Sequence, residues 1–414
     1  MSDTAAARKL RMGMVGGGRG AFIGAVHRSA AALDGRIELV CGAFSSDPDC
    51  ARASGAELFL PPARCYESFA EMLRVEAALP IGQRMDFVSI VTPNHLHAPM
   101  ATAALHAGFP VLCDKPLALS LREALDLRAV VRASALPFAL THNYTGYPLV
   151  KEARALVRGG CIGAVRKVVV EYPQGWLATR IEASGHRQAS WRTDPARAGL
   201  AGCVGDIGTH AENLAEYVTG LRIRELAADL TSFVDGRPLD DDANVLLRFE
   251  GGAKGALIAS QIAVGEENNL SLRVWGSSGG IEWHQREPNS LWLKSADQPT
   301  RLLRTGSAGL SPTAAAATRL PPGHPEGYIE AFANIYRAFA AQVAAHVDGL
   351  SPPSDALDHP TIDDGVRGMA FIEAVVASSR ANAAWTPLAA DAMPRAASSS
   401  KSAPPVAPQA PPVR

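Results

Sequence analysis

The sequence predicts an α/β chain, with a doubly wound parallel sheet at the N-terminus and then an α+β domain on an open, mostly antiparallel sheet. Three observations predict this architecture. Apolar strand segments alternate with helical segments over residues 9–142, and a glycine-rich turn follows the first of these strands. After residue 142 the strand segments follow one another with short turns, which is typical of antiparallel pairing.

The N-terminal part contains five apolar strand segments with helical segments between them. Strands that are apolar nearly throughout are expected to be buried on both faces, as in a parallel sheet. Ser120 and Glu123 form an S-x-x-E capping pair that predicts the start of one helix. The predicted strands are Arg11–Gly16, Ile37–Ala43, Asp86–Val91, Phe109–Cys113 and Phe138–Thr141, and the predicted helices are Phe22–Leu33, Pro99–His106 and Leu121–Ala133.

The C-terminal part reads as an antiparallel meander with helices before and after it. We expect a flexible N-terminus at 1–8, a nucleotide-type domain at 9–142, an α+β domain at 143–385 and a disordered tail at 386–414. The tail has seven prolines and no aromatic residue, so it has little apolar surface to bury. The predicted strands are Asn244–Glu250, Ala253–Gln261, Leu270–Trp275, Gly280–His284, Leu291–Lys294 and Arg301–Arg304, and the predicted helices are Pro148–Arg158, Thr209–Val218, Gly327–Val343 and Gly365–Ser379.

Composition and charge exclude several classes of protein. The formal net charge of −1 provides no basic field to hold nucleic acid or an anionic membrane. The six cysteines are scattered without a C-x-x-C pair, which argues against a zinc ribbon or a disulfide scaffold and favours a reducing compartment. No apolar run approaches the ~18 residues of a membrane span, and residues 1–18 lack the apolar core of a signal peptide. We therefore expect a cytoplasmic protein whose partner is a small molecule.

A glycine-rich turn joins the first strand to the first helix. Gly16, Gly18 and Ala21 match the pattern G-x-G-x-x-A, with Arg19 inside it. In the Rossmann dinucleotide-binding fold, the first position permits a tight turn, the second lets the backbone approach a pyrophosphate, and the third lets helix and strand pack closely. The helix N-terminus then directs N–H groups at the phosphates. The flanking strand and helix favour dinucleotide binding over a glycine turn that binds nothing.

The end of the second strand departs from the usual dinucleotide-binding pattern. An acidic residue for the adenine ribose hydroxyls is expected about 20 residues after the glycines. Ser45 and Ser46 stand there instead, and Asp47 follows beside Pro48, where it also suits a turn. Neither serine position holds an arginine that would bind the 2′-phosphate of NADP. The sequence favours NAD as the cofactor and leaves NADP open.

Three polar clusters lie where this architecture places ligands. Thr92–His97 and Asp114–Pro116 each follow a predicted strand, and Gly205–His210 opens a predicted helix. Asp206 and His210 are four residues apart and would share a helix face, so the carboxylate is expected to orient the imidazole. A histidine base, with the lysine of the second cluster stabilising an alkoxide, suits removal of hydride from a secondary alcohol.

Each of these residues also has a purely structural interpretation. Lys115 alone would be a surface lysine, His210 a capping or core histidine, and Asp206 a helix N-cap. One alternative function is a metal-dependent hydrolase that uses His95 and His97 with the other histidine and aspartate. That function leaves the glycine motif without a use, and we expect no metal. A second alternative is a nucleotide sensor that has kept the fold, which would not need a base.

The order and spacing of these motifs resemble the Gfo/Idh/MocA family, named after glucose–fructose oxidoreductase, inositol 2-dehydrogenase and a rhizopine-catabolism protein. The resemblance covers roughly residues 9–380. It rests on GMVGGGRGAFIG at Gly13–Gly24, VTPNHLH at Val91–His97, CDKP at Cys113–Pro116, WRTDPARAG at Trp191–Gly199 and GDIGTH at Gly205–His210.

The resemblance implies an NAD(P)-dependent dehydrogenase of a sugar, inositol or related cyclic polyol, or an enzyme that shuttles hydride between two sugars on a tightly bound cofactor. It implies that Lys115, Asp206 and His210 are catalytic, with His210 accepting the hydroxyl proton. The family's Glu-Lys-Pro motif falls on residues 114–116, so Asp114 replaces Glu here. The expected cofactor-binding residues are Gly16, Gly18, Arg19, Ala21, Ser45, Thr92, Pro93, Asn94, His97, Asp114 and Lys115.

The substrate is expected to lie against the second domain. The expected substrate-binding residues are Tyr144, which follows the last predicted parallel strand, Trp191 and Arg192 in a polar loop, and His210. His324, before a late helix, is a weaker candidate that also suits a helix entry. The resemblance further implies a homodimer or homotetramer formed through the antiparallel sheet.

Overall fold

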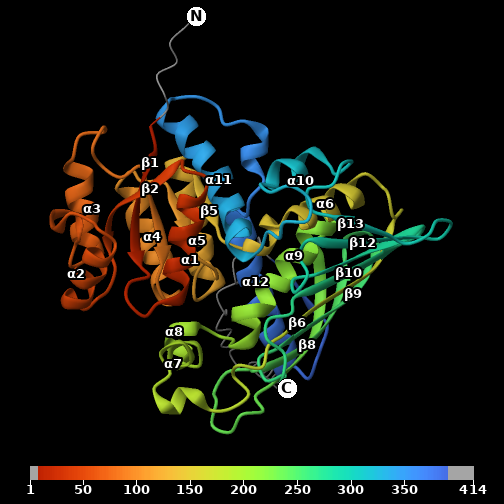
Figure 1. Cartoon of the computed structure of the whole chain (residues 1–414). Coiled ribbons are helices and arrows are strands. Elements are labelled where there is room, and N and C mark those ends of the chain that lie inside the picture. The colour runs from red at the N-terminus through yellow and green to blue at the C-terminus, as the bar shows by residue number, and fades with distance from the viewer. Residues whose placement is uncertain (1–7, 390–414) are drawn as a thin grey trace, which may run out of the picture.

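The computed structural model describes residues 8–389 and shows two sheets side by side, each packed with helices (Figure 1). The N-terminal sheet has five parallel strands in the order β2-β1-β3-β4-β5, which confirms the predicted doubly wound architecture. Its strands are β1 (Leu10–Gly16), β2 (Ile37–Ala43), β3 (Phe87–Val91), β4 (Val111–Cys113) and β5 (Phe138–Leu140), and the helices between them are α1 (Phe22–Leu33), α2 (Pro48–Glu57), α3 (Phe69–Ala78), α4 (His97–His106) and α5 (Leu121–Ser134).

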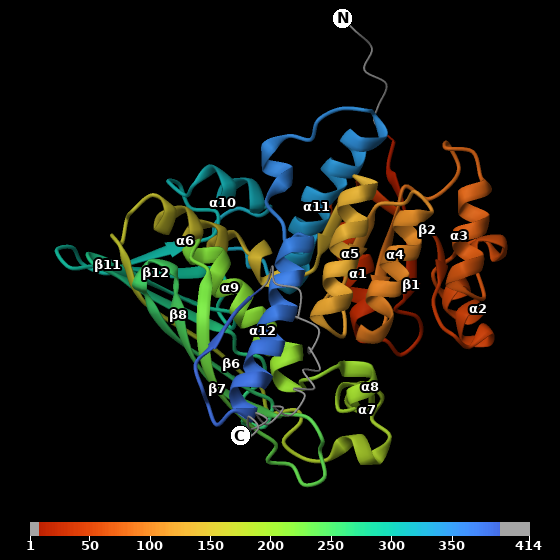
Figure 2. The same cartoon turned by 180° about the vertical axis from the view of Figure 1, so that it is seen from behind.

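Helices from both ends of the chain cover this parallel sheet. On one face β1 and β3 pack against α1 and against α11 (Tyr328–Val347), where the rings of Phe87 and Phe339 lie 5.3 Å apart, edge to face. Figure 2 shows α11 beside the N-terminal sheet. By sequence position we assigned this helix to the second domain, but it packs against the first, because its apolar face completes the cover that α1 begins.

The second sheet has nine strands in the order β13-β12-β11-β10-β6-β9-β8-β7-β14. Neighbouring strands are antiparallel except β6 and β9, so the expected open, mostly antiparallel sheet is confirmed. Its strands are β6 (Val165–Pro173), β7 (Ile223–Thr231), β8 (Asp242–Phe249), β9 (Lys254–Ser260), β10 (Ser271–Gly276), β11 (Gly279–His284), β12 (Ser290–Ser295), β13 (Arg301–Arg304) and β14 (Thr386–Pro387).

Helices cover one face of the second sheet and leave the other face open (Figure 1). Apolar side chains of α6, α9 and α12 join those of the strands in one core, and β8, for example, turns every second residue toward it. The remaining helices of this part are α6 (Pro148–Arg158), α7 (Arg187–Arg192), α8 (Pro195–Ala198), α9 (Thr209–Thr219), α10 (Pro312–Ala317) and α12 (Ile362–Arg380). Four of the observed elements, β6, β7, α2 and α3, were not predicted from the sequence.

The predicted start of the C-terminal tail was wrong by a few residues. Thr386 and Pro387 form β14, which pairs antiparallel with β7, and Leu388 is buried. The strand edge of β7 and an apolar contact hold these residues, which composition alone does not reveal. The remainder of the predicted tail, from residue 390, lies outside the described residues. So do residues 1–7 of the predicted flexible N-terminus, whereas Arg8 forms an ion pair with Asp86 at 2.6 Å.

The six cysteines are free thiols: Cys41, Cys50, Cys65, Cys113, Cys161 and Cys203. Within residues 8–389, no helix combines the length and the apolar character that a membrane crossing requires.

Candidate active site

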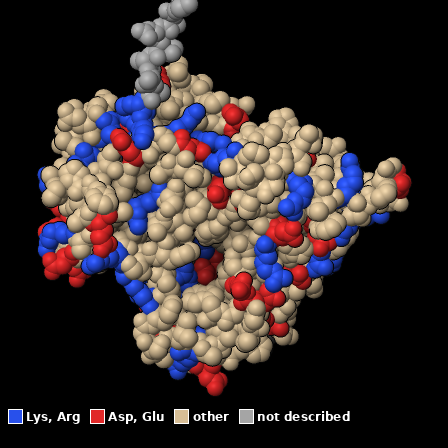
Figure 3. Space-filling model, viewed as in Figure 1, with Lys and Arg blue, Asp and Glu red and all other residues tan. Residues whose placement is uncertain are grey.

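A cleft of about 1330 Å³ separates the parallel sheet from the second domain. It runs along the carboxyl ends of β1, β2, β3 and β4, where ligands of doubly wound sheets bind. Figure 3 shows the surface hollowed between the two parts of the molecule. Most of the predicted site residues line this cleft, namely Gly16, Gly18, Ala21, Ser45, Thr92, Pro93, Asn94, Asp114, Lys115, Tyr144, Trp191, Arg192, Asp206 and His210.

The glycine turn is built so that its backbone forms the floor of the cleft. Gly16 has a φ of +77°, and a Cβ there would lie 2.9 Å from the Val91 carbonyl oxygen and from Thr92 Cγ2. A Cβ on Gly18 would lie 2.8 Å from the carbonyl oxygen of Phe44. Side chains at these two positions would therefore push the turn away from its neighbouring strands and close the space that a pyrophosphate needs.

Gly24, which was not among our predicted residues, allows α1 to pack closely against the turn. A Cβ on Gly24 would lie 2.2 Å from the carbonyl oxygen of Gly17 and 2.4 Å from its Cα. Ala21 is the N-cap residue of α1, and its N–H donates to the Gly18 carbonyl at 3.0 Å. Gly24 lies in the first turn of helix α1, and this part of the helix contacts Gly17 in the glycine-rich loop.

Arg19 does not reach the cleft, contrary to our prediction that it binds cofactor. Its guanidinium pairs with Glu57 at 2.7 Å on the surface. Its backbone N–H donates to Ser54 Oγ at 3.0 Å. The position next to the glycines therefore anchors the turn to α2, and the spacing of the motif could not show this.

At the end of β2, Ser45 and Ser46 line the cleft, whereas Asp47 does not. The Asp47 carboxylate accepts from the N–H of Cys50 at 2.8 Å and caps the N-terminus of α2. This is the turn interpretation that the sequence left open. The acidic residue expected at the end of the second strand is therefore missing from the cleft at that position.

The Thr92–His97 loop contributes its first residues to the cleft and its last to the core. The Asn94 side-chain amide donates to the Ala198 carbonyl at 3.2 Å and so joins the two domains. His97 is buried, with Nδ1 2.6 Å from the Pro116 carbonyl oxygen and Nε2 2.8 Å from that of Thr92. His97 therefore ties this loop to the lysine loop and does not line the cleft, although we predicted that it binds cofactor, whereas His95, which we treated as a spacer, lines the cleft.

The same geometry bears on the alternative metal site. Both ring nitrogens of His97 face carbonyl oxygens at hydrogen-bond distance, so neither nitrogen is directed at a position that a metal could share with His95. Among residues 8–389, no group of three or more His, Cys, Asp or Glu side chains is arranged to hold a metal ion.

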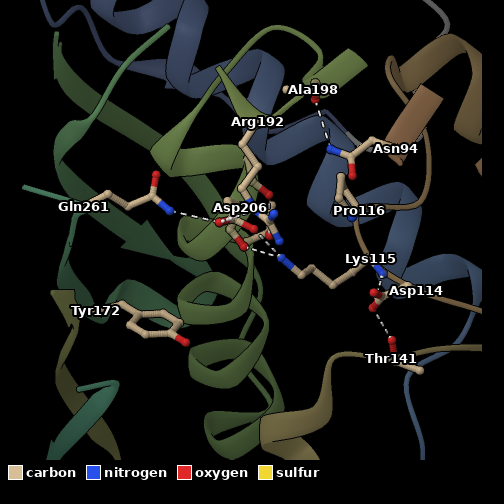
Figure 4. A network of polar contacts seen from close by, with 12 residues as sticks. Asn94, Asp114, Lys115, Pro116, Thr141, Tyr172, Arg192, Ala198, Asp206 and Gln261 are labelled. Atoms are coloured by element: carbon tan, nitrogen blue, oxygen red, sulfur yellow. Dashed lines mark hydrogen bonds and ion pairs between the residues drawn. The ribbon is translucent and has the colours of Figure 1, made fainter. Parts of the chain in front are cut away.

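Asp206 is the centre of a polar network that joins the two domains (Figure 4). Lys115 Nζ lies 3.0 Å from Asp206 Oδ1 and 2.5 Å from the Asp206 carbonyl oxygen. The other carboxylate oxygen accepts from Arg192 Nε at 3.2 Å and from Gln261 Nε2 at 2.9 Å. Lys115 and Arg192 hold the pKa of Asp206 well below its usual value, although burial alone would raise it. Gln261 was not among our predicted residues.

Asp206 lies in a single π-helical turn, Val204–Gly208, that leads into α9. No hydrogen bond joins Asp206 to His210 among the described contacts, so the expectation that this carboxylate directly orients the imidazole was wrong. The π turn shifts the register of the two side chains, and three donors already occupy the carboxylate. Four-residue spacing predicted a shared face, but only the local backbone decides the contact.

Asp114 supports the lysine loop from the side of the parallel sheet. Its Oδ1 accepts from Thr141 Oγ1 at 2.6 Å and from the backbone N–H of Lys115 at 2.9 Å (Figure 4). Nearby His27 and Lys115 lower the pKa of this carboxyl against the effect of burial. The carboxylate thus fixes the backbone from which Lys115 extends.

His210 lines the cleft at the start of α9 and is packed by aromatic rings. The ring of Tyr144 lies 4.9 Å away and that of His142 lies 5.4 Å away, both edge to face. Its Nδ1 is buried without a hydrogen-bond partner. Burial, followed by the charges of Lys115 and His142, lowers the pKa of His210 well below its usual value of 6.5. The imidazole is therefore neutral near pH 7 and able to accept a proton.

The far wall of the cleft carries neutral hydroxyl and amide groups. The Tyr144 and Tyr172 hydroxyls are hydrogen-bonded to each other, and Asn268 bonds to both of them. We predicted Tyr144 from the sequence but not Tyr172 or Asn268, because Tyr172 lies in β6 and Asn268 in the loop before β10, with no shared motif. The further lining residues of this kind are Asn143, Gln174, Gln285 and Tyr328.

Trp191 and Arg192 extend over the cleft from α7. The Arg192 guanidinium lies 4.2 Å from the Trp191 ring centre, in a cation–π contact. His324 lies outside the cleft, is exposed and contacts the Pro321 carbonyl oxygen. This position agrees with the alternative that His324 belongs to the segment that enters the late helix.

The residues of the cleft fit a bound dinucleotide. The side-chain-free turn at Gly16 and Gly18 faces the N-terminus of α1, which suits a pyrophosphate. Thr92, Pro93, Asn94 and Lys115 also line the cleft, and these residues could hold the nicotinamide end of the dinucleotide. Together, the fold and the site define an oxidoreductase with an NAD-binding Rossmann domain.

Comparison with known proteins agrees with this class and names the family. Residues 10–158 match the oxidoreductase family with an NAD-binding Rossmann fold, and residues 150–282 match the GFO/IDH/MocA C-terminal domain. YfiI of Bacillus subtilis, named as an uncharacterized oxidoreductase, is 34% identical over 381 residues, covering 91% of this chain and 96% of YfiI. The chain belongs to the Gfo/Idh/MocA family of oxidoreductases.

Two solved structures share the whole architecture. An oxidoreductase from Sinorhizobium meliloti is 49% identical, with a TM-score of 0.82 and coverage of 91% of this chain and 99% of that one. An inositol dehydrogenase homologue from Azotobacter vinelandii complexed with NAD+ is 37% identical, with a TM-score of 0.87 and coverage of 92% and 98%. The same homologue has been crystallised with NADH and myo-inositol. These matches establish an NAD-dependent dehydrogenase that acts on CH–OH groups.

Proposed function

We propose that this protein oxidises a secondary hydroxyl of a neutral sugar, inositol or related cyclic polyol, with Lys115, Asp206 and His210 as its catalytic residues. The observation that carries the proposal is the meeting of Lys115, from the end of β4, with Asp206 of the second domain, in a cleft that His210 also lines. This group lies beside the residues that would hold the nicotinamide. NAD, when bound, supplies the hydride acceptor at nicotinamide C4.

His210 is proposed to take the hydroxyl proton at Nε2. Its Nδ1 is buried, whereas the ring lines the cleft, so Nε2 is the nitrogen that a substrate reaches. The lowered pKa keeps this nitrogen free to accept a proton near neutral pH.

Lys115 is proposed to stabilise the negative charge that develops on the substrate oxygen as the proton leaves. Asp206 holds the ammonium group from two sides, through its carboxylate and its backbone carbonyl. Arg192 and Gln261 bind the second carboxylate oxygen and so hold Asp206 in place. Asp206 is thus proposed to position Lys115 and not His210.

The neutral far wall supports a polyol substrate. Tyrosine hydroxyls and side-chain amides both donate and accept hydrogen bonds, as sugar hydroxyls do. Trp191 offers a flat apolar face that suits the C–H side of a ring. The A. vinelandii homologue was crystallised with myo-inositol, a cyclic polyol, which supports the same substrate class here.

The test is the absorbance of newly formed NADH with purified protein, NAD and a panel of inositols, aldoses and anhydrosugars. We expect one cyclic polyol to give turnover, and Lys115→Ala to lower kcat by about 10²–10³-fold with NADH affinity kept within about twofold. Lys9→Ala, at an exposed lysine outside the cleft, is the control and should match the wild type. Loss of nucleotide binding in Lys115→Ala would assign the lysine to the cofactor and overturn its catalytic role.

We also propose that copies of this chain associate through the open face of the nine-stranded sheet. Large apolar side chains are exposed on its strands, with Leu246 at 55%, Leu302 at 43% and Trp292 at 41%. Trp292 and Leu302 are directly opposite on β12 and β13, and neighbouring exposed apolar groups often mark an interaction surface. Light scattering should give a dimer or tetramer, and Leu246→Asp combined with Trp292→Asp should give a monomer.

A cytoplasmic location is proposed on the six free thiols, which persist in a reducing compartment. Fractionation of cells that express the protein at its natural level tests this location.

A further inference from the structure

The end of the cleft that would hold the adenosine contains a carboxylate from a residue far along the chain from the glycine motif. The acidic residue expected at the end of β2 is absent, because Ser45 and Ser46 stand there and Asp47 caps α2. Glu67 nevertheless lines the cleft beside these serines, together with Ser68 and Phe69. It comes from the segment that leads into α3, more than 50 residues after Gly16.

Strand pairing explains how Glu67 reaches this place. The Tyr66 N–H donates to the Gly42 carbonyl at 2.9 Å, and Gly42 forms an isolated parallel bridge with Cys65. The segment around residue 65 thus runs alongside the free edge of β2 in the same direction. Two residues further on, Glu67 is level with Phe44, at the carboxyl end of the sheet. A carboxylate from the neighbouring segment therefore stands where the end of β2 lacks one.

The charges around Glu67 disfavour the binding of the 2′-phosphate of NADP. Its Oε1 pairs with Arg52 Nη1 at 2.7 Å, and Arg52 Nη2 pairs with Asp49 at 2.5 Å. Two carboxylates and one guanidinium leave this group with a net charge of −1. Acidic and basic side chains alternate on the surface over α2 and α3 (Figure 3). A 2′-phosphate, which carries about −1.5 to −2 charges at pH 7, would meet Glu67 in the cleft and an arginine already paired on both sides.

We propose that Glu67 selects NAD over NADP in this protein: its carboxylate accepts from the adenine ribose hydroxyls and repels a 2′-phosphate. Glu67 is a specificity-determining residue for the cofactor. The inference depends on NAD binding in this cleft and not on the proposed substrate or catalytic roles, because it concerns only the adenosine end.

The experiment measures the Kd of NADH and NADPH by fluorescence titration, without substrate, on the full-length protein. We expect the wild type to bind NADH at least about tenfold more tightly than NADPH. In Glu67→Gln the NADPH affinity should rise so that this ratio falls by about tenfold, the effect of removing one nearby like charge. Raising the ionic strength should narrow the wild-type ratio, because this carboxylate is partly exposed and its charge is screened.

The Arg19–Glu57 pair provides a matched control. Its contact is also 2.7 Å and its side chains are 61% and 53% exposed, against 54% and 62% for Arg52 and Glu67, but neither residue lines the cleft. Glu57→Gln should therefore leave the NADH-to-NADPH ratio within twofold of the wild type. Competition by 2′,5′-ADP against NADH should improve in Glu67→Gln and stay unchanged in Glu57→Gln.

Three results would overturn the proposal. The first is a wild type that binds NADPH as tightly as NADH. The second is an NADH-to-NADPH affinity ratio in Glu67→Gln that equals both that of the wild type and that of Glu67→Asp, which keeps the charge. The third is a selective loss of NADPH affinity in Arg52→Ala, which would make Arg52 a phosphate ligand. Failure of the wild type to bind either nucleotide would instead contradict the NAD assignment itself, which separates the two conclusions.

Discussion

The two walls of the cleft present different chemical groups: mainly backbone on one side and side chains on the other. The wall formed by the parallel sheet presents backbone, shaped by glycines and strand ends, with Gly16 and Gly18 as its clearest features. The wall formed by the second domain presents side chains, with Asp206, Arg192 and His210 held by ion pairs and rings. Backbone shape thus suits the dinucleotide, whereas the side chains proposed to act on the substrate meet from both walls, Lys115 from the end of β4 with Asp206 and His210 from the second domain.

The largest expected effect separates the side-chain wall from the backbone wall. His210→Ala should lower kcat/KM by roughly 10²–10⁴-fold, because a general base is lost, while the NADH Kd stays within about twofold. Turnover assays and fluorescence titration measure the two quantities. His324→Ala, an exposed histidine outside the cleft, is the control and should be unaffected. A His210→Ala protein with more than a tenth of wild-type turnover would show that another group is the base.

The backbone wall should respond in the opposite way. Gly24→Ala places a methyl group 2.2 Å from the Gly17 carbonyl oxygen, so the turn must move. We expect a loss of about 1–3 kcal/mol in the free energy of unfolding together with weaker NADH binding. Urea denaturation and NADH titration check both. Gly82→Ala, where a Cβ meets nothing within 4 Å, should be neutral; equal effects in the two variants would refute the packing argument.

His97 connects the two loops of the backbone wall and should show an intermediate effect. His97→Phe leaves the Thr92 and Pro116 carbonyl oxygens without their partner, at a cost of about 1–3 kcal/mol for a buried polar group. We expect a lower thermal midpoint and a modest fall in kcat. If His97 instead bound cofactor directly, the NADH Kd would rise at unchanged stability, and this outcome would restore the original sequence prediction.

The smallest expected effect concerns the pH dependence of the side-chain wall. Since the base must be unprotonated, kcat/KM falls as pH drops through the pKa of His210, and burial with the Lys115 charge places this fall below pH 6.5. The pH profile of the wild type measures it. Gln261→Leu removes one donor to Asp206 and should shift the limb by less than about one unit. An acid limb above pH 6.5 would contradict a buried, neutral histidine base.

Features of this protein that depend on neighbouring residues could be predicted from the sequence. The alternation of apolar strands and helices predicted the parallel sheet, and the glycine turn predicted the nucleotide end, because both signals lie in short stretches of the chain. The polar clusters after two parallel strands predicted that Thr92 and Lys115 would line one cleft, since parallel strands bring their carboxyl ends to one edge.

Tertiary structure alone decided the contacts between segments that are distant in sequence. It placed Gly24 against the turn, buried His97 between two loops, paired Asp206 with Lys115 and not with His210, and brought Glu67 beside β2. The physical reason is that a hydrogen bond or a close approach depends on ångström-scale geometry set by packing. Residue type and spacing specify which groups are available, but packing specifies which of them meet.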